Sequence, residues 1–420
     1  MRVLHANNVD LYGRRFNGFD LLGDLRPFGV RGTQAVLTKL SHHPDVVSLM
    51  KTRADESLHG VLVRVEERHS MNCLLFPWGR RLMDAEEFST ADVVHYHLIH
   101  NQMVSLLDLP RMFASRPAVW TFHDPWPLTG HCIYPKQCEK WQTGCVDCPA
   151  LGAMFPMRGN HADRMWKVKR RVFSQLDVDI VVASEFMMNL VKRSPLTSHF
   201  ERVHLIPFGI DTTVYLADSE RAVSRRLLGI PEDDFVLLFR STLSDVKGLS
   251  HIIQALGIRR PERKTTLLTV DCRGLLRGLT GAYNVVELGW VESESLHPHV
   301  FSACDVFLMP STAEAFGLMA LEAMAAGRPV ICFNGTSLPS VTHAPECGVA
   351  VPLGDTHALR AAVDDLANDP DPAANTAVPG GFAGVLATGR FIGSVRPNRK
   401  TCIRRGLCGG RCPGSRPTSR

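Results

Sequence analysis

Two glutamates, Glu314 and Glu322, mark the stretch of this sequence that is best suited to chemistry. Residues 318–326 are mostly good helix formers, and Gly327 followed by Pro329 predicts where that helix ends. Apolar runs at 305–310 and 330–333 predict one buried strand before the helix and another after it. The loop after the first strand therefore brings Glu314 to the helix N-terminus, and Glu322 follows about two turns later.

The start of this helix is also a predicted anion site. The backbone N–H groups of Phe316, Gly317 and Leu318 lack helical partners there, and such groups attract phosphate. Gly317 would allow a ligand to approach the backbone closely. Two carboxylates beside a phosphate site suit a nucleotide sugar, which has phosphate in its middle and hydroxyl groups at both ends. The alternative is a surface helix that carries two ordinary glutamates.

Two cations and a histidine lie at the predicted ends of other strands. Arg240 ends the predicted strand 235–240, and Lys247 with Gly248 opens the next helix. Cations fixed there would stabilise the charge of a leaving diphosphate, although both could be ordinary surface residues. His123 follows the predicted strand 118–122, and ligands of open α/β sheets gather at the carboxyl ends of strands. The alternative for His123 is that it only caps the strand.

These motifs together resemble the retaining GT-B glycosyltransferases of family 4. The similar features are E-x7-E followed by G-x-P-V-I, the R…K-G pair, and the passage T-F-H-D-P-W-P-L-T-G-H-C…C-x2-C-P. That passage is similar to a subgroup found in bacterial operons for exopolysaccharide, capsule and O-antigen. The resemblance implies a role for each residue: Glu314 and His123 contact the transferred sugar, Arg240 and Lys247 grip the diphosphate, Phe316, Gly317 and Leu318 hold sugar and diphosphate through their backbone, and Glu322 holds the ribose.

Four cysteines follow the His123 strand with the spacing C-x5-C-x6-C-x2-C. They are Cys132, Cys138, Cys145 and Cys148. Four thiolates within such a short segment could bind one tetrahedral zinc ion, which would stabilise the loop without taking part in catalysis. A redox pair or an ordered loop of metal-free thiols are the alternatives. We predict no cofactor for catalysis itself, because no G-x-G-x-x-G is present and the Asp177–Asp179 pair reads as the polar start of a strand.

The length of 420 residues predicts two domains. We expect an α/β protein of GT-B fold, with two Rossmann-like domains that face each other across a cleft. The predicted divisions are an acceptor-side domain over 1–206 with a Cys-rich loop at 126–150, a linker at 207–225, a nucleotide-sugar-binding domain over 226–370, and a Gly/Pro/Arg-rich, disordered tail over 371–420. A first strand near residue 3 and a helix capped by Thr33 through Leu40 are expected to open the first domain.

Charge and hydropathy limit the partners. The formal net charge is +5, but residues 371–420 hold eight Arg and one Lys against one Asp, which leaves −3 for the rest. We therefore expect no nucleic-acid partner. No apolar run reaches the length of a membrane span, so a cytoplasmic protein is expected. The basic helix over 160–173 could face the inner surface of the membrane, although a domain helix with a solvated basic face is the simpler interpretation.

The resemblance implies that the protein transfers a sugar, with retention, from a nucleotide-diphosphate sugar to a hydroxyl of a glycan or lipid-linked acceptor in cell-surface polysaccharide synthesis. Other interpretations stay open. One is a different GT-B enzyme of activated sugars, such as an epimerase or phosphorylase. Another is an inactive, zinc-stabilised binding protein, because the tail replaces the closing helices that the family predicts and a change of reading frame could explain it. A third is an adaptor that uses its basic tail.

Overall fold

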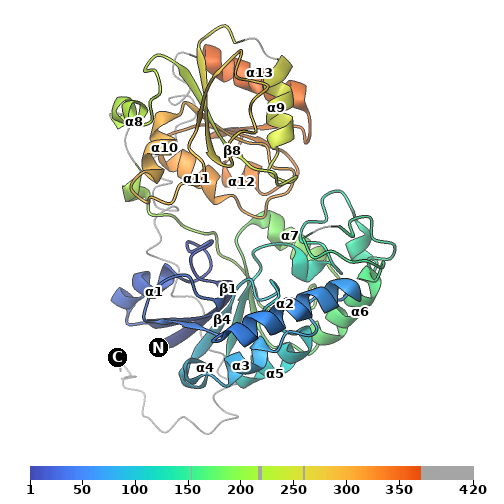
Figure 1. The fold of residues 1–420 in the computed structure, drawn as a ribbon. Coiled ribbons are helices and arrows are strands. Elements are labelled where there is room, and N and C mark those ends of the chain that lie inside the picture. The colour runs from blue at the N-terminus through green and yellow to red at the C-terminus, as the bar shows by residue number, and fades with distance from the viewer. Residues whose placement is uncertain (153, 216–219, 259–260, 370–420) are drawn as a thin grey trace, which may run out of the picture.

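The computed structural model describes residues 1–152, 154–215, 220–258 and 261–369, which form two lobes (Figure 1). The first lobe contains a seven-stranded sheet with the order β3-β2-β1-β4-β5-β6-β7, and all of its pairings are parallel. Its strands are β1 (Arg2–Val9), β2 (Arg31–Thr38), β3 (Val46–Ser48), β4 (Val93–Tyr96), β5 (Ala118–Thr121), β6 (Asp179–Val182) and β7 (Val203–Leu205).

The second lobe contains a six-stranded parallel sheet with the order β10-β9-β8-β11-β12-β13. Its strands are β8 (Phe235–Ser241), β9 (Thr265–Asp271), β10 (Asn284–Glu287), β11 (Val306–Met309), β12 (Val330–Phe333) and β13 (Gly348–Val351). Both sheets place a later strand beside the first one, since β4 pairs with β1 and β11 pairs with β8. Ligands of such folds bind where the strand order reverses.

Helices connect the parallel strands. In the first lobe these are α1 (Leu21–Asp24), α2 (Arg53–Arg68), α3 (Trp78–Met83), α4 (Glu86–Thr90), α5 (Leu109–Ser115), α6 (Ala162–Phe173) and α7 (Glu185–Arg193). The connection to the second lobe and that lobe contain α8 (Arg221–Leu227), α9 (Leu249–Ile258), α10 (His297–Ala303), α11 (Leu318–Ala325), α12 (Leu338–Val341) and α13 (Thr356–Asn368). Short 3-10 turns cover Arg26–Phe28, Leu106–Asp108, Trp126–Leu128, Lys140–Gln142 and Thr212–Val214.

Strand β8 shows why both faces of the second sheet are covered. Its residues are almost all buried, and alternate side chains point to opposite faces. Val236 and Leu238 join the core on the side of α10 and α11, while Leu237 and Phe239 join the core on the side of α9 and α13. Continuous burial of this kind requires helices on both faces. The predicted GT-B architecture of two Rossmann-like domains is confirmed.

Most predicted strands are present, but the predicted helix from Thr33 to Leu40 is wrong. Residues 31–38 form β2, which pairs with β1 on one side and with β3 on the other. Gln34, Ala35 and Val36 are fully buried between these neighbours. A short apolar run fits a buried strand as well as a helix, and here the two neighbouring strands decide the outcome.

The basic helix predicted over 160–173 is observed as α6, but its basic residues are not all solvated. Lys167, Arg170 and Arg171 are exposed, whereas Lys169 is fully buried. The apolar face of α6, with Met165 and Val172, packs into the core of the first lobe. Only the exposed cations of α6 could therefore contact a membrane surface. Among the helices that the structure describes, none combines the length and the apolar composition of a membrane span.

The predicted linker at 207–225 lies between the two sheets, and its last residues belong to α8. The last strand of the first sheet ends at Leu205 and the first strand of the second sheet begins at Phe235. These ends do not define where each domain stops, so the domain boundaries stay predictions. The predicted tail over 371–420 lies outside the described residues.

Candidate functional site

A cavity of about 440 Å³ lies between the two lobes. In Figure 1 the labels of α11 and α12 stand on the side of the second lobe that faces the first, and α7 lies on the facing side of the first lobe. A direct contact joins the lobes here, because the Ser184 hydroxyl at the start of α7 donates to the carbonyl of Ala315 at 2.6 Å. The lining contains seven of the predicted site residues: His123, Arg240, Lys247, Glu314, Phe316, Gly317 and Leu318.

The loop before α11 is held in a conformation that only glycine adopts easily. Gly317 caps α11 with φ of +105°, in the left-handed region. A Cβ atom at this position would lie 2.5 Å from Leu338. The Ser337 hydroxyl supports the loop, lying 3.1 Å from the carbonyl of Glu314 and 3.0 Å from that of Phe316. The chain therefore presents a fixed helix N-terminus to the cavity, as the sequence predicts.

The cation Lys247 and the carboxylate Glu314 are paired with each other. The Nζ of Lys247 donates to Oε2 of Glu314 at 2.7 Å, and both side chains are largely buried. Gly248, directly after Lys247, has φ of +80°, and its Cα lies so close to Pro310 that a Cβ would meet the Pro310 carbonyl oxygen at 2.0 Å. Lys247, which is predicted to bind the diphosphate, and Glu314, which is predicted to contact the sugar, thus form an ion pair with each other.

Arg240 lies at the carboxyl end of β8, and its Nε donates to Asp271 at 2.7 Å. Asp271 ends the neighbouring strand β9, so the pair bridges two strand ends beside the cavity. About a third of the Arg240 side chain is exposed. The guanidinium is therefore oriented by Asp271 and remains accessible from the cavity.

Glu322 occupies a different place from the other predicted residues. It lies on α11, is only 2% exposed, and is absent from the cavity lining. Its carboxylate forms an ion pair with Arg15 from the loop after β1 in the other lobe, and His297 lies 3.6 Å away. Arg14, the neighbour of Arg15, pairs with Glu294 of the second lobe. The glycine-containing loop after β1 thus directly contacts Glu322, the residue that is predicted to bind the ribose.

His123 faces the cavity between two aromatic rings. Phe208 stacks on it with an interplanar angle of 16°, and Phe16 approaches from the loop after β1. The Nε2 atom of His123 lies 3.0 Å from Nδ1 of His97. Burial, with smaller effects from neighbouring groups, lowers the pKa of His123 to about 3, so its imidazole is neutral near pH 7.

Several cavity residues were not predicted from the sequence. Phe16, Phe208 and Tyr134 line it, and the Phe208 ring lies at 5.1 Å from Phe316 in an edge-on arrangement. Burial, together with the nearby carboxylates of Glu314 and Asp124, raises the pKa of Tyr134 well above its ordinary value, so its hydroxyl keeps its proton. No motif in the sequence had marked Phe16 or Tyr134 as cavity residues.

Asp124, the neighbour of His123, also lines the cavity and contacts the start of the Cys-rich loop. Its carboxylate lies 3.1 Å from Nε2 of His100 and accepts the Trp126 N–H at 2.9 Å. Burial by itself would raise the pKa of Asp124, but the His100 imidazole and the Trp126 N–H outweigh this, and the pKa is lowered. Asp124 therefore serves to fix the chain after β5, which positions His123.

The four cysteines of the predicted zinc site lie in one loop, and Cys132, Cys145 and Cys148 are buried. The N–H of Gly130 donates to Sγ of Cys145 at 3.2 Å. Burial, reinforced by neighbouring thiols, raises the pKa of Cys132 to about 12. Among the described residues, however, these sulfur atoms do not form a group whose members all lie within 4.8 Å of one another. A zinc ion at Cys132, Cys138, Cys145 and Cys148 stays a prediction.

The buried Lys169 lies beneath the same loop. Its Nζ donates to the carbonyls of Trp126 and Thr129 at 2.7 and 2.9 Å, and it sits 3.3 Å from the centre of the Trp126 ring. Burial lowers the pKa of Lys169 to about 7, although nearby thiols and Asp124 partly oppose this. Lys169 therefore ties the start of the Cys-rich loop to α6.

The carboxylates of Asp177 and Asp179 are paired with neighbouring basic side chains. Arg202 contacts both at 2.5 and 3.1 Å, and His204 lies 2.8 Å from Asp179. These contacts join the start of β6 to β7 and agree with the interpretation of the pair as a polar strand start.

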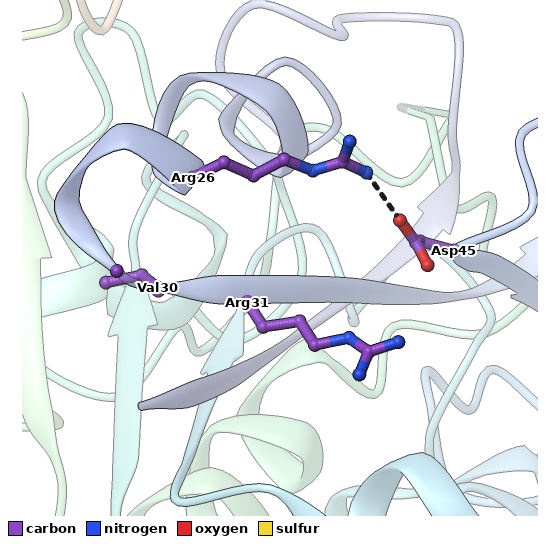
Figure 2. Close-up of a pocket in the computed structure, with 5 residues that line it drawn as sticks. Arg26, Val30, Arg31 and Asp45 are labelled. Carbon is purple, nitrogen blue, oxygen red and sulfur yellow. Dashed lines mark hydrogen bonds and ion pairs between the residues drawn. The ribbon is translucent and has the colours of Figure 1, made fainter.

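A second pocket of about 360 Å³ lies at the edge of the first lobe and is lined by Arg26, Gly29, Val30, Arg31 and Asp45 (Figure 2). Arg26 and Asp45 close one side of it through an ion pair of 2.7 Å. None of the predicted site residues lies here. Of these two pockets, the one between the lobes contains the predicted site residues.

Two family models match the chain. Residues 34–214 match the model described as Glycosyltransferase Family 4, and residues 220–378 match the model described as Glycosyl transferases group 1. The two matches meet close to the connection between the two sheets, so each lobe corresponds to one model.

Curated relatives match parts of the chain. The D-inositol 3-phosphate glycosyltransferase of Paenarthrobacter aurescens (strain TC1) is 31% identical over 189 residues, which are 41% of this chain and 46% of the relative. The putative colanic acid biosynthesis glycosyl transferase WcaC of Escherichia coli (strain K12) is 33% identical over 91 residues, 20% of this chain and 22% of the relative. The chain thus spans less than half the length of these two relatives.

The fold as a whole is similar to that of Anabaena HepE, whose crystal structure was determined in complex with UDP-glucose. The TM-score is 0.59 over 90% of this chain and 93% of that one, with 18% sequence identity. At this identity the likeness is one of fold.

Proposed function

Because the chain belongs to the GT-B glycosyltransferases of the group 1 and family 4 type, we propose that it transfers a sugar from a nucleotide-diphosphate sugar to a hydroxyl group of an acceptor. The observation that carries this proposal is the cavity between the lobes. It brings His123 of the first lobe together with Arg240, Lys247 and Glu314 of the second. HepE, which has a similar fold, was solved with a UDP-sugar, and this supports the donor class.

The cations have the position and the charge that a leaving diphosphate needs. When the bond from sugar to diphosphate breaks, negative charge grows on the diphosphate, and fixed cations in a closed site stabilise that charge. In our proposal the diphosphate draws Lys247 away from Glu314, and Arg240 contacts the same group while Asp271 orients it. The backbone N–H groups of residues 316–318, at the start of α11, complete the anion site.

The released carboxylate of Glu314 and the neutral imidazole of His123 then orient the transferred sugar through its hydroxyl groups. We propose that the acceptor hydroxyl attacks on the face that the diphosphate leaves, which retains the anomeric configuration without a protein nucleophile. The reaction in this scheme requires no metal or other cofactor. The ribose would be held by Glu322 once Arg15 has moved away from that carboxylate.

The acceptor and the biological role are also proposals. We propose a glycan or lipid-linked acceptor and a role in cell-surface polysaccharide synthesis at the cytoplasmic face of the inner membrane. The named role of WcaC in colanic acid biosynthesis supports the pathway class. The exposed cations of α6 support contact with an anionic membrane surface. A structural zinc ion at the four cysteines would stiffen the loop that follows His123.

Donor binding by calorimetry tests the proposal. The full chain is titrated with UDP-, GDP- and dTDP-sugars, and Lys247→Ala and Glu322→Ala are compared with Lys264→Ala, which changes an exposed lysine of the same lobe. We expect one donor class to bind and Lys247→Ala to weaken it roughly tenfold to a hundredfold, which corresponds to about 1.5–3 kcal/mol for a charge-assisted contact. Lys264→Ala should bind as the unmodified chain does.

Two other outcomes would overturn the proposal in different ways. Donor binding without turnover, for a range of glycan and lipid-linked acceptors, would identify an inactive binding protein. No binding by any donor sugar, or binding unaffected by both variants, would show that the cavity is not a donor site and would reopen the case for another reaction of activated sugars.

A further inference from the structure

Three histidines of the first lobe form a group that the proposed reaction does not use. They are His5 on β1, His95 on β4 and His97 just after β4. Strands β1 and β4 are neighbours, and their register pairs His5 directly with His95. His95 and His97 are two residues apart, so both side chains leave the chain on the same side of the sheet. The sheet itself therefore collects the three imidazoles.

The ring nitrogens of this histidine trio lie close enough to share one ion. One ligand atom from each residue lies within 4.8 Å of the other two, and among the described residues no other three or more His, Cys, Asp or Glu side chains do so. Nδ1 of His5 and Nε2 of His97 are 3.2 Å apart. Two nitrogens that bind one tetrahedral zinc at 2.0–2.1 Å lie about 3.3–3.4 Å from each other.

One ring nitrogen of His95 and one of His97 already have a hydrogen-bond partner. Nε2 of His95 lies 2.7 Å from the Thr121 hydroxyl, and Nδ1 of His97 lies 3.0 Å from Nε2 of His123. Metal-binding histidines usually have such a partner on the nitrogen that faces away from the metal, because it fixes the ring and its tautomer. Nε2 of His5 is buried without a hydrogen-bond partner in the described structure.

The histidine trio is closed by the loop after β1. Gly18 packs against His5 so tightly that a Cβ on this glycine would lie 2.5 Å from Nδ1 of the ring. The same loop carries Arg14 and Arg15, which contact the second lobe. On its other side, the trio is linked to the cavity residue His123 through His97.

We propose that His5, His95 and His97 bind one divalent transition-metal ion of the zinc class. Three imidazoles and no carboxylate suit Zn²⁺, Co²⁺ or Ni²⁺ and do not suit Mg²⁺ or Ca²⁺. A four-coordinate ion would take water as its remaining ligand. The ion lies outside the donor cavity and serves to hold β1, β4 and the loop after β1 together, which fixes His123 through His97. This site is separate from the four cysteines and does not depend on the proposed reaction.

Cobalt binding tests this proposal on the full chain. The protein is freed of metal with a chelator and titrated with Co²⁺, while bound metal per chain and the visible absorption spectrum are recorded. We expect a bound equivalent that is lost in His5→Gln and in His95→Gln and is kept in His69→Gln, which changes an exposed histidine. Circular dichroism of each variant establishes that it is folded, and His95, which is only half-buried, is the substitution that the fold tolerates more easily.

The cysteines provide the second arm of the experiment. In a chain with Cys145→Ser and Cys148→Ser, the histidine-dependent equivalent should remain, and its spectrum should lack the charge-transfer band of a cobalt–thiolate bond. Thr121→Val, which removes the hydroxyl beside His95, should weaken binding roughly tenfold to a hundredfold. The proposal is overturned if folded His5→Gln and His95→Gln chains bind as much cobalt as the unmodified chain. It is also overturned if the double cysteine variant loses all cobalt. Either result would leave the trio as a hydrogen-bonded chain of neutral rings.

Discussion

Replacing Lys169 by Met should make the stability of the first lobe less dependent on pH. The ammonium group of Lys169 is fully buried against Trp126, with two carbonyls as its hydrogen-bond partners. Burial lowers its pKa from the ordinary value of 10.5 to about 7. Between these two values the unfolded chain binds a proton that the folded chain does not hold, so the free energy of unfolding rises with pH.

The magnitude follows from these two pKa values. One unit of pKa shift is about 1.36 kcal/mol, and near pH 7 only half of the folded molecules have lost the proton. Between pH 7 and pH 9 the titration of Lys169 should therefore add about 2 kcal/mol to the free energy of unfolding. Met fills a similar volume and does not titrate, so a Lys169→Met chain should lack this increase.

Urea unfolding at pH 7 and pH 9, followed by tryptophan fluorescence, measures the effect. Five of the six tryptophans precede residue 206, so the signal reports mainly on the first lobe. The matched control is Lys167→Met, which changes an exposed lysine of the same helix, α6, and should follow the unmodified chain. If Lys169→Met and the unmodified chain gain the same stability between the two pH values, Lys169 is protonated in the folded state and the reasoning from burial is wrong.

Three further results are expected. The Arg15→Ala chain should bind the donor about fivefold more tightly by calorimetry, because the donor no longer has to break the ion pair of about 1 kcal/mol between Arg15 and Glu322. The control variant Arg14→Ala should show no such gain. Weaker donor binding by Arg15→Ala would mean that Arg15 itself contacts the donor. Donor affinity should not depend on the protonation of His123 between pH 5 and pH 8. Burial lowers the pKa of His123 to about 3, so its imidazole stays neutral throughout this range. An inflection near pH 6.5 in the plot of affinity against pH, abolished by His123→Gln, would contradict this. If the Cys-rich loop binds zinc, a chelator should lower the melting temperature of the unmodified chain by several degrees more than that of the Cys145→Ser and Cys148→Ser chain. An equal decrease in the melting temperature of both chains would argue against a metal at the thiols.

Local features of the sequence were sufficient to predict seven of the residues that line the cavity between the lobes. The glycines at 317 and 248 predict positions where other atoms pack closely against the backbone. Both positions have positive φ and no room for a Cβ atom. His123 and Arg240 follow apolar runs, and the ends of parallel strands converge at one edge of a sheet. The strand at 31–38 was missed because its short apolar run has no period of its own, and only its pairing with β1 and β3 determines its conformation.

The sequence by itself determined the α/β fold with its two parallel sheets and seven of the residues that line the cavity, because these depend on the order of strands, glycines and polar strand ends along the chain. The tertiary structure alone decided which charges meet. Arg15 lies more than 300 positions before Glu322, yet the packing of one lobe on the other pairs them. Burial of Lys169 and the meeting of His5 with His95 and His97 have the same origin. Contacts of this kind depend on how sheets and helices pack, and local sequence patterns carry no record of that geometry.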